Sequence, residues 1–210
     1  MKSIFLCLFY ILNVSICGDR PTKRDLIVCD GNSLTEGFGS SSIDNSYPGL
    51  LKKGGWNTVN LGVSGQQAST MILNAPEKID TLWMKGAWVV FWEGINSFVT
   101  HENHSPEDGY SLLKTYIKDR KSRGFKTIVV TMIPTGHPTF LSRGIENFRK
   151  EYNRLIRDNS ASADLIVDLS KDPRLENAMD DMYFNASDRI HLTNEGYQAV
   201  YDNFEQAFFK

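Results

Sequence analysis

Three residues that could together carry out nucleophilic acyl transfer are spread along the chain. Ser33 stands in the string DGNSLTEG, directly after the apolar run at residues 26–29. Far downstream, Asp188 and His191 stand three residues apart in the string SDRIHL. A serine hydroxyl is a weak nucleophile until a base removes its proton, and a histidine oriented by a carboxylate is such a base. These residue types therefore indicate attack of a serine on an acyl carbon.

The elements that would position these residues alternate along the chain. Short apolar, β-branched runs predict strands at residues 26–29, 58–63, 87–92, 127–133 and 165–169. Amphipathic stretches predict helices at residues 47–53, 66–74, 77–85, 106–123, 145–158 and 194–209. Strands that alternate with helices predict an α/β fold with a parallel, doubly wound sheet.

In such a sheet, ligands bind beyond the carboxyl ends of the strands, near the point where the strand order reverses. Ser33 follows the first predicted strand, Gly65 the second and Asn96 the third. Asp188 and His191 lie in the long connection after the fifth strand, which can reach back across this edge. We therefore expect all five residues at one edge of the sheet.

Four ordered blocks of the sequence resemble the SGNH hydrolases, also called the GDSL esterase/lipase family. GNSL at 31–34 resembles the family's Gly-Asp-Ser-Leu block, which holds the nucleophilic serine. NLGVSG at 60–65 and WEGIN at 92–96 are similar to the second and third blocks, which supply oxyanion-hole donors. DRIH at 188–191 matches the last block, Asp-x-x-His. The resemblance implies a three-layer α/β/α, flavodoxin-like fold with five parallel strands, and ester hydrolysis without a cofactor.

The chemistry of the residues agrees with the roles that the resemblance implies. Ser33 would be the nucleophile, His191 the general base, and Asp188 the acceptor that orients His191. The backbone N–H groups of Ser33 and Gly65 and the side-chain amide of Asn96 would form the oxyanion hole. Glycine suits position 65 because the backbone must come close to the substrate there.

The expected function is that of a serine esterase that works through an acyl-enzyme. The chain has no obvious long lid and no extra domain, which favours short acyl groups such as acetyl on a small or carbohydrate alcohol. The expected partner is therefore a small-molecule ester or an acylated carbohydrate. Two alternatives stay open: an acyltransferase that uses the same triad, and a non-catalytic binding protein on the same fold.

Two residues depart from the family pattern. Asn32 stands where the family usually has Asp; it keeps an acceptor that can cap the turn but removes a charge beside Ser33. Ser97 stands where Asp usually follows the asparagine of the third block. This second change leaves open how Asn96 is held.

Other polar and aromatic residues are weaker candidates. Trp92 and His137 could line a substrate cleft, although a surface loop is an equally good interpretation for His137. His101, Glu102 and His104 form a short tract whose spacing does not match a zinc motif, so a solvated loop is favoured. The sequence thus predicts neither a metal nor a cofactor.

Residues 1–18 have the pattern of a signal peptide. Lys2 precedes an apolar stretch at residues 4–16, which is too short and interrupted for a membrane span. We expect residues 19–210 to form a single domain of a secreted or periplasmic protein, without a stable membrane span once the signal is removed. A lipid anchor at Cys17 is the alternative.

The composition is that of an ordinary globular protein. The 210 residues are 41% hydrophobic and 23% charged, with a net charge of −2. This charge gives no electrostatic reason to expect nucleic acid as a partner. Of the three cysteines, Cys7 and Cys17 belong to the predicted leader, so only Cys29 would remain, as a small buried apolar residue. The oligomeric state is left open.

Overall fold

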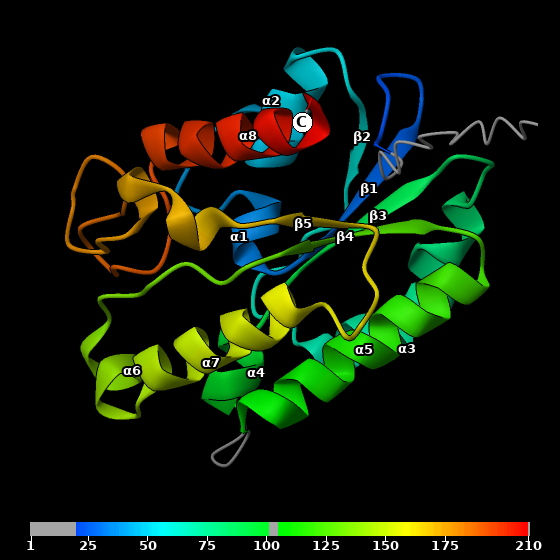
Figure 1. Ribbon diagram of the computed structural model, residues 1–210. Coiled ribbons are helices and arrows are strands. Elements are labelled where there is room, and N and C mark those ends of the chain that lie inside the picture. The colour runs from blue at the N-terminus through cyan, green and yellow to red at the C-terminus, as the bar shows by residue number, and fades with distance from the viewer. Residues whose placement is uncertain (1–19, 101–104, 210) are drawn as a thin grey trace, which may run out of the picture.

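The computed structural model describes residues 20–100 and 105–209, which form a sheet covered by helices on both faces (Figure 1). The strands are β1 (Leu26–Gly31), β2 (Asn57–Asn60), β3 (Trp88–Trp92), β4 (Lys126–Val130) and β5 (Leu165–Val167). Every neighbouring pair runs parallel, and the order is β2-β1-β3-β4-β5. The predicted three-layer fold with a five-stranded parallel sheet is confirmed, and its strand order is the flavodoxin-like one.

Alternate residues of β1, β3, β4 and β5 pack into two separate cores. In β1, Ile27 and Cys29 face one core, whereas Leu26 and Val28 face the other. This follows from the two-residue period of a strand. Both faces are covered, so the strands are apolar on both sides, which explains why continuous apolar runs mark them in the sequence. Burial raises the pKa of the Cys29 thiol to about 12, as expected for a residue that acts as a small apolar side chain.

Two groups of helices cover the sheet (Figure 1). One face packs against α2 (Tyr47–Lys53) and α8 (Asn194–Phe209). The opposite face packs against α3 (Ala68–Lys78), α5 (Pro106–Ser122) and α7 (Ile145–Asp158). Shorter elements connect them: α1 (Ser33–Glu36), α4 (Ile95–Thr100), α6 (Pro138–Ser142) and the 3-10 turns η1 (Ile43–Asn45), η2 (Asp80–Leu82), η3 (Leu169–Lys171) and η4 (Pro173–Leu175).

The helix predictions are correct for α2, α7 and α8 and wrong in one region. Instead of helices at residues 66–74 and 77–85, the chain forms the single helix α3 and then the short turn η2. Pro76 lies within α3, two residues before its last residue, where the loss of one backbone donor does not divide the helix. The short helices α4 and α6 were not predicted, because five or six residues show no helical period.

The strand order places the carboxyl ends of β1 and β3 side by side. Gly31, the last residue of β1, pairs with Trp92, the last residue of β3. The order reverses between these two strands, which is where open α/β sheets bind their ligands. Ser33 begins α1 two residues after Gly31, and Asn96 lies in α4 four residues after Trp92.

Two parts of the chain bear on contact with a membrane: the described residues and the predicted signal peptide. Within residues 20–100 and 105–209, no helix has the length and apolar character needed to cross a membrane. The predicted signal peptide at residues 1–18, with the alternative anchor at Cys17, lies outside the described residues and stays a prediction.

Candidate functional site

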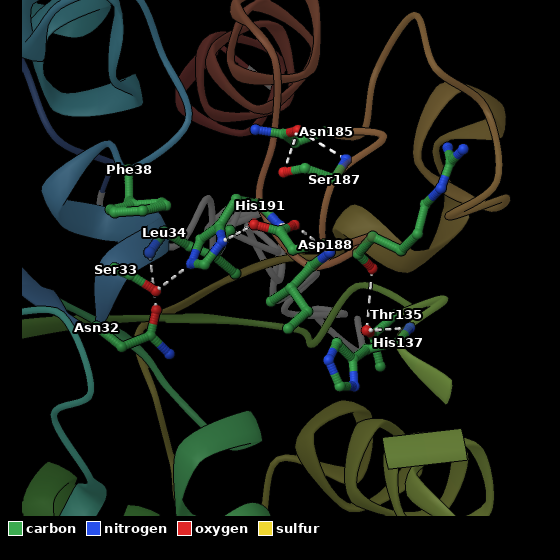
Figure 2. Close-up of polar contacts among 12 residues, drawn as sticks. Asn32, Ser33, Leu34, Phe38, Thr135, His137, Asn185, Ser187, Asp188 and His191 are labelled. Carbon is green, nitrogen blue, oxygen red and sulfur yellow. Dashed lines mark hydrogen bonds and ion pairs between the residues drawn. The ribbon is translucent and has the colours of Figure 1, made fainter. Parts of the chain in front are cut away.

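Ser33, His191 and Asp188 form a continuous hydrogen-bonded chain (Figure 2). Nε2 of His191 lies 2.9 Å from Oγ of Ser33, and Nδ1 lies 2.7 Å from Oδ2 of Asp188. Each ring nitrogen of His191 thus contacts a different partner. This is the geometry in which an imidazole can take the serine proton while a carboxylate fixes its orientation.

The turn after β1 holds Ser33 at the first position of α1. Asn32 is the N-cap of this helix, and its Oδ1 accepts the N–H of Leu34 at 2.9 Å (Figure 2). The prediction that Asn32 caps the turn is confirmed. A Cβ on Gly31 would lie 2.2 Å from Oγ1 of Thr35, so only glycine allows the turn to close this tightly. The first N–H groups of a helix have no acceptor within it, which leaves the Ser33 N–H suited to an external acceptor.

Asp188 organises the turn that carries His191. Its Oδ1 accepts the backbone N–H groups of Ile190 at 2.8 Å and His191 at 3.0 Å, while Oδ2 contacts the imidazole. Partial burial acts to raise the pKa of Asp188. The hydrogen bonds from His191 and Ile190 outweigh that effect, so the pKa lies below its ordinary value. Asp188 is therefore held as a carboxylate, the form that can stabilise an imidazolium.

Arg189 gives this turn its shape. Its φ of 58° lies in the left-handed region, which is costly for a residue with a side chain. Three hydrogen bonds hold it there: its N–H donates to the Asn185 carbonyl, and its own carbonyl accepts the Gly136 N–H at 2.8 Å and the Thr135 hydroxyl at 3.0 Å. The loop after β4 thereby fixes the segment that presents His191.

The loop after β2 packs directly on α1. Oε2 of Glu36 accepts the N–H of Ser64 at 2.8 Å and also its hydroxyl. A Cβ on Gly62 would lie 2.1 Å from the backbone nitrogen of Glu36, so the two segments are in close contact. Gly65 is exposed, with φ 77°, and an added Cβ there would meet no described atom within 4 Å. Its backbone conformation favours glycine, and the space in front of it is open.

Asn96 reaches across to the same loop. Its Nδ2 donates to the Gln66 carbonyl at 3.1 Å, next to Gly65. A side-chain amide carries two N–H donors, so one is left for another acceptor. The Nε2 of Gln66 in turn donates to Oδ1 of Asp30 and to the Gly31 carbonyl, both at 3.1 Å. Contacts between neighbouring residues thus bring the segments of Ser33, Gly65 and Asn96 together.

Two buried carboxyl groups lie under these segments, and sequence reasoning missed both. Asp30 is 4% exposed and accepts the Tyr116 hydroxyl at 2.8 Å; burial raises its pKa to about 6 against the opposing effect of its hydrogen bonds. Glu93 is 1% exposed, and burial raises its pKa to about 8. The available signal was an acidic residue at the end of an apolar run, as in CD at residues 29–30 and WE at 92–93.

Because the pKa values of Asp30 and Glu93 are raised, we predict that the protein becomes less stable as pH rises. The folded state binds their protons more tightly than the unfolded state does, so unfolding releases protons between the ordinary and the raised pKa values. For Glu93 this window runs from 4.5 to about 8. For Asp30 it runs from 3.8 to about 6. Within its own window, each group lowers the free energy of unfolding by up to roughly 1.4 kcal/mol per pH unit. Urea unfolding at several pH values should show this slope, and Glu93→Gln should reduce it; an unchanged slope would contradict the assignment.

A small cavity of about 10 Å³ is lined by residues next to Ser33 and His191 in the sequence, Asn32, Leu34 and Ile190, and also by Glu93. Its walls are mainly apolar and include Leu34, Trp92, Met132, Ile133 and Ile190. Trp92, a candidate cleft residue, thus lines a cavity, although it is only 2% exposed. His137 does not line it. Its ring packs on Phe140 of α6 with centroids 4.5 Å apart, and Figure 2 shows it beside Thr135, apart from the Ser33–His191 pair.

Phe38 is an additional aromatic residue at the site that the sequence did not single out. Its ring lies against the His191 ring, with centroids 4.4 Å apart, and the residue is 54% exposed (Figure 2). The Tyr197 hydroxyl donates to its carbonyl at 2.8 Å and fixes the backbone at this point. Phe38 therefore presents an accessible apolar surface next to the imidazole.

The described residues offer no evident metal site. Within residues 20–100 and 105–209, no three His, Cys, Asp or Glu side chains are placed so that they could hold a metal ion. His101, Glu102 and His104 lie outside the described residues, so the interpretation of this tract as a solvated loop stays a prediction.

Solved structures with this fold include several esterases and lipolytic proteins. A putative lipolytic protein of the G-D-S-L family from Desulfitobacterium hafniense aligns with a TM-score of 0.71 and 17% identity, covering 87% of this chain and 98% of its own. A variant of Axe2, an acetyl-xylooligosaccharide esterase from Geobacillus Stearmophilus, gives 0.66 and 17%, with 91% and 96% covered. The psychrotrophic esterase EstA from Pseudoalteromonas sp. gives 0.65 and 13%, with 87% and 96% covered. At these identities the likeness shows the fold.

Sequence comparison identifies the family. Among curated protein sequences no match to this chain was found. The sequence model of the GDSL-like Lipase/Acylhydrolase family, however, matches residues 29–199, which is most of the chain and includes Ser33, Gly65, Asn96, Asp188 and His191. The resemblance drawn from the four sequence blocks is thereby confirmed, and the chain belongs to the GDSL-like lipase/acylhydrolase family.

Proposed function

We propose that this protein is a serine esterase that hydrolyses carboxylic esters of short acyl groups through an acyl-enzyme. The observation that carries the proposal is the hydrogen-bonded chain from Ser33 through His191 to Asp188. Family membership supports a hydrolase, and the chain geometry supplies a nucleophile, a base and an orienting carboxylate in contact with one another. We also propose, from the predicted signal peptide, that the enzyme is secreted or periplasmic.

The proposed reaction has two halves. Ser33 Oγ attacks the acyl carbon and its proton passes to Nε2 of His191. The bond to the alcohol oxygen then breaks, His191 returns the proton to the leaving alcohol, and the acyl group stays on Ser33. Water, deprotonated by His191, attacks the acyl-enzyme, and the acid leaves as Ser33 regains its proton. Asp188 remains ionised throughout and stabilises the imidazolium.

Three donors would stabilise the oxyanion that forms in each half of the reaction. They are the backbone N–H groups of Ser33 and Gly65 and the side-chain amide of Asn96. Support comes from the packing of the Gly65 loop on α1 and from the Asn96–Gln66 hydrogen bond, because these contacts hold together the segments that carry the three groups. Such preorganised donors are worth more than hydrogen bonds in water, because they face the developing charge before it forms.

The size of the cavity supports short acyl groups. The cavity of about 10 Å³ is small, which favours a small group such as the methyl of an acetyl group. Longer chains would have to displace Leu34, Trp92 or Ile133 or lie outside the cavity. One structure with the same fold is named as an acetyl-xylooligosaccharide esterase, which agrees with acetyl as the group to test first.

A chain-length series tests this proposal. On nitrophenyl acetate, butyrate and octanoate, kcat/KM should fall with each step because longer acyl groups do not fit the cavity. Ile133→Ala should open the cavity and raise the butyrate-to-acetate ratio of kcat/KM about tenfold, as expected when a pocket gains room for one or two methylene groups. A wild-type enzyme that prefers octanoate would contradict the short-acyl proposal.

Phe38 supports an acylated carbohydrate as the alcohol side of the substrate. Its exposed ring beside His191 offers an apolar face on which a sugar ring can stack. We predict that Phe38→Ala raises KM for acetylated xylo-oligosaccharides about fivefold to tenfold and changes kcat/KM for nitrophenyl acetate less than threefold. Equal losses on both substrates would show that Phe38 acts on His191 and not on the alcohol. Product analysis with added acceptor alcohols separates this esterase from an acyltransferase.

A further inference from the structure

We propose that Glu93 is a positioning residue of the oxyanion hole, whose buried carboxyl group holds the start of α4 and thereby places Asn96. This inference rests on the proposed function, because the placement of Asn96 matters in this way only if an oxyanion forms. Glu93 stands between β3 and α4, directly after Trp92 and three residues before Asn96. It is the point at which the sheet passes into the helix that carries the donor.

The contacts of Glu93 are those of a helix cap. Its Oε1 accepts the backbone N–H of Ser97 at 3.1 Å, and the N–H of Asn96 and the hydroxyl of Ser97 also act on the carboxyl group, lowering its pKa against the effect of burial. The N–H groups in the first turn of a helix have no acceptor within the helix, and a side-chain oxygen that accepts them fixes the helix start. Here the fixed residues are Asn96 itself and its neighbour.

Ser97 extends this hold to the neighbouring loop. Its Oγ accepts the N–H of Ala68 at 3.1 Å, while its backbone N–H donates to Glu93. Ala68 begins α3 just after Gln66, the residue whose carbonyl accepts the Asn96 amide. Two bridges therefore join α4 to the loop of Gly65: one is made by the Asn96 side chain, and the other runs from Glu93 through Ser97. This explains how Asn96 is held although Ser97 replaces the usual Asp.

The surroundings of Glu93 suit an uncharged carboxyl group. The residue is 1% exposed, and its Oε2 has no hydrogen-bond partner among the described residues. Burial raises its pKa to about 8, and it interacts electrostatically with the Tyr152 side chain of α7. A neutral group with one accepting oxygen is closely imitated by glutamine. Glu93→Gln should therefore preserve the hold on Ser97 and Asn96, and Glu93→Ala should remove it.

A double-mutant cycle between Glu93 and Asn96 tests the proposal on nitrophenyl acetate. Glu93→Ala should lower kcat about tenfold to 100-fold with KM within threefold, because a displaced donor is lost only in the transition state. Asn96→Ala should lower kcat by at least about 100-fold. The double variant should be no slower than Asn96→Ala by more than threefold, since Glu93 acts through Asn96. Glu93→Gln should stay within threefold of wild type.

Asp164 provides a matched control on the opposite edge of the sheet. It too accepts a backbone N–H and a hydroxyl from one residue, Thr127, both at 2.9 Å. Asp164→Ala should lower the Tm without changing kcat. If Glu93→Ala does not fold, Ser97→Ala breaks the same bridge, and its loss of kcat should likewise vanish in the Asn96→Ala background.

Several outcomes would overturn the positioning role. They are a Glu93→Ala loss that persists at full size in the Asn96→Ala background, an effect on KM alone, or an equal loss in a folded Glu93→Gln variant. If wild-type protein hydrolyses the ester and the cycle is additive, the role of Glu93 fails while the proposed function stands. If wild-type protein hydrolyses no ester, both fail.

Discussion

Replacement of Ser33 by alanine should lower kcat for hydrolysis of nitrophenyl acetate by at least about 10⁴-fold. The variant lacks the oxygen that attacks the acyl carbon, so no acyl-enzyme can form. Residual rate would come from the oxyanion donors and from binding alone, which still accelerate the reaction roughly 10³-fold to 10⁴-fold over water in enzymes with such a triad. The loss is far larger than any single hydrogen bond to Ser33 could account for.

The fold should survive this change. Asn32 caps α1 through Leu34, and Ser33 belongs to neither apolar core. The Tm of Ser33→Ala should therefore remain within a few degrees of wild type, and substrate binding should persist. Ser122→Ala, an exposed serine at the end of α5, is the matched control and should retain full turnover. A Ser33→Ala enzyme with wild-type turnover would show that another residue is the nucleophile.

Replacement of Asp188 by asparagine should lower kcat about 10³-fold to 10⁴-fold and leave the fold intact. The Asp188 carboxylate accepts from Nδ1 of His191 at 2.7 Å, which leaves Nε2 free to accept the proton of Ser33. An asparagine can turn its N–H₂ toward Nδ1 and so favour the tautomer with the proton on Nε2. That imidazole cannot act as the base for Ser33 and gains no stabilisation when it is charged.

Asp181→Asn is the control for this variant. Asp181 belongs to the same surface region and pairs with Arg189, the residue after Asp188, but its side chain is 69% exposed. Pairs at this exposure contribute little, so its loss should change kcat less than threefold. Steady-state kinetics and a thermal melt of both variants decide the matter. Equal losses in the two variants would mean that the shape of the turn matters and the carboxylate of Asp188 does not.

The strands and long helices could be predicted because their signals are local. The apolar run at 87–92 becomes β3 at Trp88–Trp92, and α7 and α8 have the predicted bounds. The prediction at 58–63 is too long, since β2 ends at Asn60. There the Asn60 side chain accepts the Gly62 N–H, and the chain turns onto α1. That turn depends on contact with Glu36, about 25 residues earlier in the chain. Such a contact leaves no local pattern in the sequence.

The prediction at 127–133 fails at its end for a similar reason. β4 ends at Val130 because the backbone N–H and carbonyl of Met132 bond to the side chain of Asn153 on α7, at 2.8 Å each. The Thr131 N–H still donates to the Val167 carbonyl of β5, but from Met132 onward the backbone partners are no longer in the sheet. Contacts between distant segments thus set where a strand stops.

The same difference between local signals and long-range contacts applies to the candidate site. Ser33, Asp188 and His191 could be selected because their residue types imply a reaction and parallel strands bring their loops to one edge. Phe38 and Glu93 could not, since an exposed phenylalanine and a buried glutamate acquire meaning only from what they touch. Their contacts, the His191 ring and the start of α4, exist only in the folded chain.

The most direct test of the account asks which atom becomes covalently modified. Wild-type protein treated with a fluorophosphonate should gain one adduct per chain in its intact mass. Tandem mass spectrometry should place that adduct on Ser33, with activity lost in proportion, and Ser33→Ala should gain none. Complete inactivation with the adduct on another residue, or hydrolysis of nitrophenyl acetate by a protein that never reacts at Ser33, would contradict the central claim that Ser33 carries the acyl group.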